Sequence, residues 1–232
     1  MPINRIDLKE KAKVAFKANY SSSVIAALVL TVLTAALVGT NVNVDLNNAD
    51  ADVSATVAGA GTVIALVFSL INVFVFNPLK VGGYLFFKKN SQEKADLNEL
   101  IYAFKNNYAN SLVTTLLTDV FTFLWTLLFI IPGIVKSYSY AMVPFLIADN
   151  PDLQPMEVIK KSKQMMDGYK WQAFVLDLSF LGWEILSLLT VGILGLFYVN
   201  PYYYQTKAGL YEFLKDQEEM KDFQEFQEPV MD

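Results

Sequence analysis

The chain has 232 residues, 54% of them hydrophobic and 18% charged, with a formal net charge of -5 and a mean hydropathy of +0.35. This balance indicates a membrane protein, since a soluble domain of this size interrupts its apolar runs with charge far more often. Neither Cys nor His occurs, which excludes disulfides, thiolate nucleophiles, imidazole bases and Cys/His zinc sites.

The negative charge is concentrated at the C-terminus. From Asp216 to Asp232 the chain holds seven acids and one lysine, so the remainder is nearly neutral. No segment carries a dense Lys/Arg field, and we expect no nucleic-acid partner. Residues 216–232 are predicted to be a disordered acidic tail, either simply solvated or recruiting a cytosolic protein partner.

Two apolar runs open the chain. Residues 21–40 contain no charge and are long enough to cross about 30 Å of hydrocarbon as a helix. The run follows about twenty polar residues without a small-residue cleavage pattern after it, so we expect a retained span rather than a signal peptide. Residues 56–76 form the second predicted span, and the acidic loop 41–55 is expected outside.

The third predicted span, residues 111–131, carries Asp119 near its middle and ends at Pro132-Gly133, a pair that breaks helices. The next run, 134–149, is short and contains Lys136. If it crosses the membrane, all of the 18 Lys and Arg residues except Lys136 lie on one face, as the positive-inside rule requires. We therefore interpret it as a fourth, short or tilted span.

The last apolar stretch exceeds one crossing. A break at Thr190 to Gly192 divides it into spans 171–189 and 191–212, and Asn200-Pro201 should kink the second of these. The predicted fold is an all-α integral membrane protein: six transmembrane helices as three hairpins, in one membrane domain of residues 1–215, with both termini in the cytoplasm.

Each hairpin follows an amphipathic segment predicted to lie on the cytoplasmic interface. The helix starts are predicted at Asp7, Asp96 and Pro155. The units also resemble one another: six of nine positions of 15–23, including Asn19 and Tyr20, recur in 103–111. Asn77-Pro78 and Asn200-Pro201 follow the first and third hairpins. These likenesses predict three repeats of surface helix plus hairpin.

Several motifs together carry a family resemblance. They are Ile130-Ile131-Pro132-Gly133-Ile134, Tyr138-Ser139-Tyr140-Ala141-Met142-Val143-Pro144, Ala148-Asp149-Asn150-Pro151, Gly182-Trp183 and Asn200-Pro201-Tyr202-Tyr203. In these the chain resembles the bacterial integral membrane proteins of the domain of unknown function 975 family, and more distantly the membrane domain of some glycerophosphodiester phosphodiesterases. The resemblance implies a bacterial plasma-membrane location. It implies no catalytic residue, because that family has no agreed activity.

Three carboxylates lie within the predicted spans: Asp119, Asp177 and Glu184. An acid in hydrocarbon is costly unless paired, hydrated or protonated. They are therefore candidates for a proton or ion path, and the alternative interpretation is that each bonds to polar partners inside the bundle. A pure salt-bridge explanation is not expected, because no base is predicted at mid-span.

The surface helices supply candidate contacts to anionic lipid headgroups. These are Lys9, Lys13, Lys17, Lys160, Lys161 and Lys163, which the positive-inside rule alone also explains. No phosphate-binding loop, nucleophile elbow or dinucleotide fingerprint occurs, and we expect no enzyme, cofactor or metal site. The predicted function is a non-enzymatic plasma-membrane protein that organises lipids or partner proteins at the inner face. The alternative is a small transporter or channel that uses the mid-span carboxylates.

Overall fold

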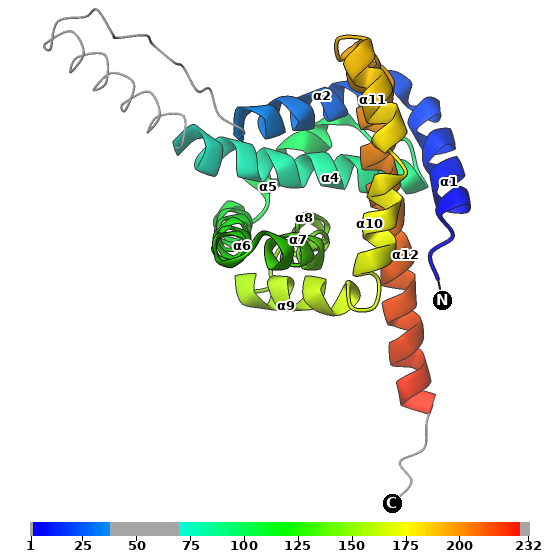
Figure 1. The fold of residues 1–232 in the computed structure, drawn as a ribbon. Helices are drawn as coiled ribbons and strands as arrows, with labels where there is room; N and C mark the ends of the chain where they lie inside the picture. Colours follow the sequence, from blue (N-terminus) through cyan, green and yellow to red (C-terminus); the bar gives the residue numbers. More distant parts are fainter. Residues whose placement is uncertain (1, 38–69, 228–232) are drawn as a thin grey trace, which may run out of the picture.

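The structure is a computed structural model that describes residues 2–37 and 70–227, and every element in these ranges is helical (Figure 1). The elements are α1 (Arg5–Ala18), α2 (Tyr20–Leu37), η1 (Asn72–Phe76), α4 (Asn77–Gln92), η2 (Leu97–Ile101), α5 (Tyr102–Lys105), α6 (Tyr108–Leu128), α7 (Ile130–Ser139), α8 (Val143–Asp149), α9 (Pro155–Met165), α10 (Lys170–Leu178), α11 (Leu181–Leu189), η3 (Gly195–Val199) and α12 (Asn200–Gln227). The predicted outer loop 41–55 and most of the second predicted span, 56–76, lie outside the described residues.

Three described segments are long and apolar enough to cross a membrane. They are α6, the α7–α8 pair (Ile130–Asp149) and the α10–α11 pair (Lys170–Leu189). A fourth arises if α1 and the start of α2, which meet at 107°, count as one broken span. For the described residues, the prediction of an all-helical protein with helices apolar and long enough to be candidate membrane spans is thus confirmed. The described segments account for three or four crossings, so the six crossings stay a prediction.

The core forms where α4 and α12 pack together and against α1, α2 and α8. Phe86, Phe145 and Tyr211 are among its fully buried side chains, and the Phe145 and Tyr211 rings stack with centroids 4.8 Å apart. Figure 1 shows α2 and α4 side by side, with α12 running past them. Large aromatic rings at this junction bury enough apolar area to fix the helices relative to one another.

A buried amide network joins the same helices. Asn19, at the bend between α1 and α2, donates to the Asn90 side chain at 2.9 Å. Asn90 in turn donates to Gln205 on α12 at 2.8 Å, and Gln205 donates to the Ser91 hydroxyl at 2.7 Å. Buried amide groups are costly unless they are hydrogen-bonded. This network therefore fixes the angle between α1 and α2.

The helix ends test the predicted start and stop signals. α9 begins at Pro155, as expected, while α1 begins at Arg5 because Asn4 rather than Asp7 provides the N-terminal cap. The expected break at Pro132-Gly133 is wrong in position: α6 ends at Leu128, and the chain turns at Phe129. Proline is tolerated in the first turn of a helix, and both residues lie within α7. The break after Leu189 is confirmed, with Gly192 at φ +82°.

The Asn-Pro repeats share a local structure. Asn77-Pro78 directly follows the π-helix η1, and Asn200-Pro201 directly follows the π-helix η3. In both places the π-helix lies directly before a proline, which cannot donate to the helical hydrogen-bond ladder. The likeness between the first and third predicted units is therefore structural as well as sequential.

The acidic C-terminus differs from its prediction as a disordered tail. α12 continues without interruption to Gln227, so residues 216–227 are helical. The segment is rich in Glu and Gln, which have high helix propensity, and the long helix before it supplies the nucleus that an isolated segment lacks.

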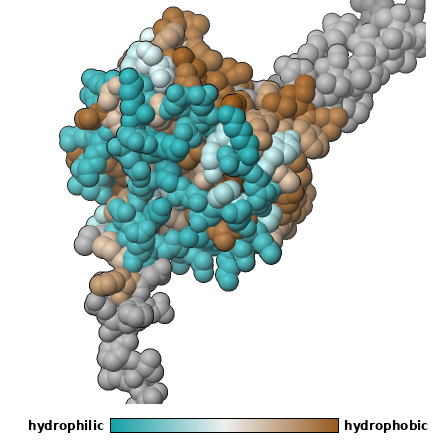
Figure 2. Space-filling view, turned by 180° about the vertical axis from the view of Figure 1, so that it is seen from behind, coloured by the Kyte–Doolittle hydropathy of each residue, from teal (hydrophilic) through white to brown (hydrophobic). Residues whose placement is uncertain are grey.

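The surface divides into a polar and an apolar part. Figure 2 shows hydrophilic residues covering much of one face and hydrophobic residues at one end and along one side. Large apolar side chains are exposed at two turns, with Phe129 and Ile131 at 70% and 76% and Leu188 and Val191 at 80% and 91%. Apolar turns of this kind suit the interior of a bilayer better than water.

Candidate functional site

Asp177 is held in an ion pair inside the helical bundle. Its carboxylate lies 2.6 Å from the Lys207 ammonium of α12 and accepts a 2.8 Å hydrogen bond from the Tyr138 hydroxyl of α7. The Lys207 side chain is only 11% exposed. The expectation that no base lies near the mid-span acids is therefore wrong for Asp177, whose environment is that of a structural ion pair.

Asp119 lies elsewhere, in the wall of a groove between α4, α6 and the α7–α8 segment. The Asn77 side chain hydrogen-bonds to it. The third unit has the corresponding contact, because Asn200 donates to Thr31 at 2.8 Å. Thr31 and Asp119 each lie eleven residues after the repeated tyrosine, Tyr20 or Tyr108. The hydrogen bond between Asn77 and Asp119 thus has an equivalent, between Asn200 and Thr31, at the same position of another repeat.

Glu184 does not join the other two acids. It lies exposed in the first turn of α11, and within the described ranges its side chain forms no hydrogen bond or ion pair. The groove that contains Asp119 is lined by neither Asp177 nor Glu184. The structure therefore does not bring the three predicted carboxylates into one path.

The predicted headgroup lysines fall into two groups. Lys9 is engaged within the protein, donating to the Ser179 hydroxyl at 2.9 Å and lying 4.1 Å from the centre of the Phe180 ring. Lys161 is partly buried, with its ammonium 3.9 Å from Glu218. The side chains of the remaining four are exposed on α1 and α9: Lys13, Lys17, Lys160 and Lys163.

Lys161 borders a basic pocket of about 420 Å³ between α4, α8, α9 and α12. Four lysines but only two carboxylates line it, namely Lys88, Lys89, Lys161, Lys215, Asp149 and Glu218. The lining residues alone leave a surplus of two positive charges, and Glu99, which pairs with Lys89 at 2.7 Å from outside the lining, reduces it to one. A basic pocket between helices near the expected cytoplasmic ends of membrane segments has the charge to bind an anionic headgroup.

Asp149 organises this basic pocket. Its carboxylate, 9% exposed, pairs with Lys88 and with Lys215, the latter at 3.2 Å, and accepts from the Tyr211 hydroxyl at 2.8 Å. Burial alone would lower the pKa of Lys215, but the neighbouring Asp149 and glutamates outweigh it and raise this pKa. One buried acid thus holds two cations in place while leaving the pocket positive.

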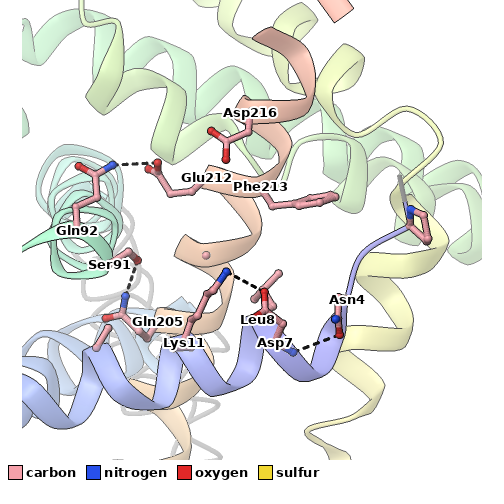
Figure 3. Close-up of a pocket in the computed structure, with 14 residues that line it drawn as sticks. Asn4, Asp7, Leu8, Lys11, Ser91, Gln92, Gln205, Glu212, Phe213 and Asp216 are labelled. Atoms are coloured by element: carbon pink, nitrogen blue, oxygen red, sulfur yellow. Dashed lines mark hydrogen bonds and ion pairs between the residues drawn. The ribbon is translucent and has the colours of Figure 1, made fainter. Parts of the chain in front are cut away.

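A second polar pocket, of about 450 Å³, lies between α1, α4 and α12 (Figure 3). Its charges are mainly acidic: Asp7, Glu212 and Asp216 line it with a single lysine, Lys11, which pairs with Asp7 at 2.9 Å. Figure 3 shows Gln92 reaching Glu212, a 3.0 Å bond. Its net negative charge makes this pocket unsuited to an anionic ligand.

Sequence reasoning missed three residues of these sites. These are Lys80 and Lys207, which the topology prediction counts only as basic residues of the cytoplasmic face, and Asp149, which it counts only as the last residue of the fourth span. The repeat contains a signal for Lys80. Asn200-Pro201 lies inside a predicted span, and the corresponding Asn77-Pro78 comes only two residues before Lys80, so the repeat places Lys80 close to a span as well. Within the described ranges, no group of three or more Asp or Glu residues is placed to hold a metal ion.

The fold and these pockets define a class: an all-helical protein with several candidate membrane-spanning helices and polar pockets between them. Residues 129–218 match the family described as protein of unknown function (DUF975). The resemblance seen in the motifs is thereby confirmed. No curated protein and no solved structure matches the chain.

Proposed function

We propose that this protein is a non-enzymatic membrane protein that binds anionic lipid headgroups at the inner face of the bacterial plasma membrane. The observation that carries the proposal is the basic pocket, where four lysines converge beside candidate membrane helices. Phosphate groups accept strong hydrogen bonds from lysine ammonium groups, and Asp149 pre-positions two of these groups. The acidic pocket between α1 and α12 does not compete for the same ligand.

The surface lysines add a second, weaker attraction. Lys13 and Lys17 project from α1, and Lys160 and Lys163 from α9. Each lysine close to an anionic bilayer contributes about 1 kcal/mol of attraction. The C-terminal part of α12, with Phe223 exposed among acids, is the proposed contact for a cytosolic protein partner.

The topology that fits this function has six crossings with both termini inside. Single cysteines at Asn47, Ser91, Gln164 and Gln227 of this cysteine-free chain can be labelled from one side of intact cells. We expect only the Asn47→Cys variant to react from outside. Labelling of Gln164→Cys from outside would exclude the six-span arrangement.

Lipid retention tests the pocket directly. Purified protein is exposed to equimolar phosphatidylglycerol and phosphatidylethanolamine, and the retained lipid is quantified by mass spectrometry. We expect Lys161→Gln/Lys215→Gln to lose most phosphatidylglycerol and Lys94→Gln/Lys105→Gln to keep it, because Lys94 and Lys105 are exposed outside the pocket. Salt should weaken retention. Equal retention by the two double variants would refute the proposal.

Replacing all six predicted headgroup lysines with Gln separates the pocket from the surface. We expect this variant, which changes Lys9, Lys13, Lys17, Lys160, Lys161 and Lys163, to lose more anionic lipid than Lys161→Gln alone. An identical loss would show that the exposed lysines serve topology only.

A small transporter or channel is the second candidate function, and the groove around Asp119 favours it. In this case Asp119→Asn would abolish proton-coupled flux into proteoliposomes under an imposed pH gradient. Because Asp177 is paired and Glu184 is exposed elsewhere, substitutions of these two should leave such a flux unchanged.

A further inference from the structure

The groove around Asp119 contains both signs of charge. It has a volume of about 460 Å³ and lies between α4, α6 and the α7–α8 segment. Lys80 and Asp119 both line it and Lys80 acts on Asp119 electrostatically, yet the two side chains make no direct ion-pair contact in the described structure. Opposite charges held apart at a membrane helix are costly unless each is solvated or bound by a ligand.

A ladder of threonines extends the groove along α6. Thr115, Thr118, Thr122 and Thr126 all line it, and the hydroxyl of each donates a 2.8 Å hydrogen bond to the carbonyl four residues earlier. With its single proton committed to the helix, each hydroxyl oxygen can offer the groove only acceptor lone pairs. The ladder covers about 16 Å at 1.5 Å per residue, roughly half the hydrocarbon thickness.

Donors are provided on the opposite wall. The Lys80 ammonium and the hydroxyls of Tyr84 and Tyr140 belong to residues of α4 and of the segment between α7 and α8. The groove therefore offers a carboxylate and hydroxyl acceptors on the α6 side and donors on the other. A simple anion would meet Asp119, and a simple cation would meet Lys80, so each is disfavoured by one wall.

The groove is also next to the surface that suits lipid. Phe123 lines it and is 65% exposed, and the neighbouring Val120 and Leu127 of α6 are exposed at 43% and 72%. A polar groove bordered by exposed apolar side chains can receive a headgroup while acyl chains lie against the helix. A soluble zwitterion would gain nothing from this apolar border.

We infer that the groove between α4, α6 and α7–α8 binds the headgroup of a zwitterionic phospholipid of the phosphatidylethanolamine type. Its ammonium donates to Asp119 and the threonine oxygens, and its phosphate accepts from Lys80 and the tyrosine hydroxyls. This site is distinct from the basic pocket at Asp149, which has a net positive lining and takes anionic lipid under the proposed function.

Competitive lipid retention tests the inference. Delipidated full-length protein is exposed to equimolar phosphatidylethanolamine, phosphatidylcholine and phosphatidylglycerol, and bound lipid is quantified by mass spectrometry. We expect Lys80→Gln and Asp119→Asn each to reduce phosphatidylethanolamine retention roughly tenfold, the scale of a lost charge-assisted hydrogen bond, without reducing phosphatidylglycerol retention. Phosphatidylcholine, whose ammonium has no proton to donate, should bind the unmodified protein less well.

Matched controls keep the test decisive. Lys94→Gln and Asp152→Asn make the same charge changes at exposed positions outside the groove and should retain phosphatidylethanolamine. If Asp119→Asn fails to fold, Thr118→Val/Thr122→Val removes two groove oxygens at constant shape. Its control is Thr206→Val, which loses the equivalent 2.8 Å bond to Tyr202 on α12.

Three outcomes would overturn the inference. Unchanged phosphatidylethanolamine retention in folded Lys80→Gln and in the threonine variant would leave the groove filled by water alone. Thermal stabilisation by soluble phosphoethanolamine, without lipid retention, would assign the groove to a soluble zwitterion. Loss of phosphatidylglycerol in parallel would indicate a general loss of lipid binding. Failure of the basic pocket is recognised separately, because it affects phosphatidylglycerol alone.

Discussion

The hydroxyl of Tyr108 donates a 2.7 Å hydrogen bond to the backbone carbonyl of Phe74, the residue four positions before Pro78. Proline has no N–H, so this carbonyl is the acceptor that Pro78 leaves without its helical partner. Tyr20 makes the same contact with the carbonyl of Phe197, four residues before Pro201, at 3.1 Å. The repeated Asn-Tyr and Asn-Pro motifs therefore complement each other. The tyrosine hydroxyl of one unit donates a hydrogen bond to the carbonyl that the proline of another unit leaves without a helical partner.

This relationship predicts a specific non-additivity. Tyr108→Phe should destabilise the protein by about 1 kcal/mol, the usual contribution of one hydrogen bond. Pro78→Ala restores an N–H donor for the Phe74 carbonyl, so Tyr108→Phe should cost much less in that background. Thermal unfolding of the unmodified protein, the two single variants and the double variant measures the coupling. Tyr198→Phe is the control, because the Tyr198 hydroxyl bonds to no other described residue. Purely additive effects of Tyr108→Phe and Pro78→Ala would contradict the proposed link between the two residues.

Asp149 is predicted to be the most sensitive carboxylate. Asp149→Asn leaves Lys88, whose side chain is 14% exposed, without its ion-pair partner, and should destabilise the protein by about 3–5 kcal/mol. Asp152→Asn, at an exposed position on the following turn, should change the stability by less than about 0.5 kcal/mol. Unfolding in detergent, followed by circular dichroism, compares the two. Similar stabilities would show that the ion pairs around Asp149 are dispensable.

The raised pKa of Lys215 gives a pH dependence with a definite sign. Its folded pKa lies above the ordinary value of 10.5 because Asp149 and nearby glutamates outweigh the effect of burial. The stability contributed by charged Lys215 should thus be fully present below pH 10.5 and lost as the pH rises through the folded pKa. The unfolding-temperature gap between the unmodified protein and Lys215→Gln should persist to about pH 10.5. A gap already closed at pH 9.5 would indicate a lowered pKa instead.

The two carboxylates of the α10–α11 segment should respond differently to neutralisation. Asp177→Asn removes the partner of the nearly buried Lys207 and should cost about 3 kcal/mol. Glu184→Gln changes an exposed side chain and should cost less than about 0.5 kcal/mol. Urea or thermal unfolding of both variants distinguishes them. A larger loss for Glu184→Gln would mean that this residue has an important partner in the assembled membrane protein.

The positions of most helices could be predicted from local signals. Apolar runs of about twenty residues predicted α2 and α6, Pro155 predicted the start of α9, and Thr190-Gly192 predicted the break after α11. The exact turn at Phe129 could not, because Pro132 fits either just after a helix or in the first turn of the next. Phe129 itself carries no turn signal.

The amino-acid sequence by itself determined the all-helical class, the apolar segments, the charge asymmetry and the repeat of Asn-Tyr with Asn-Pro. These depend on composition and on residues close together in the chain. Only the tertiary structure decided how the charges are paired. Asp177 meets Lys207 across 30 positions, Asp149 meets Lys88 across 61, and Asp119 shares a groove with Lys80 without pairing. Hydropathy records the cost of placing each charge near lipid, whereas the partner that offsets this cost depends on which helices pack together.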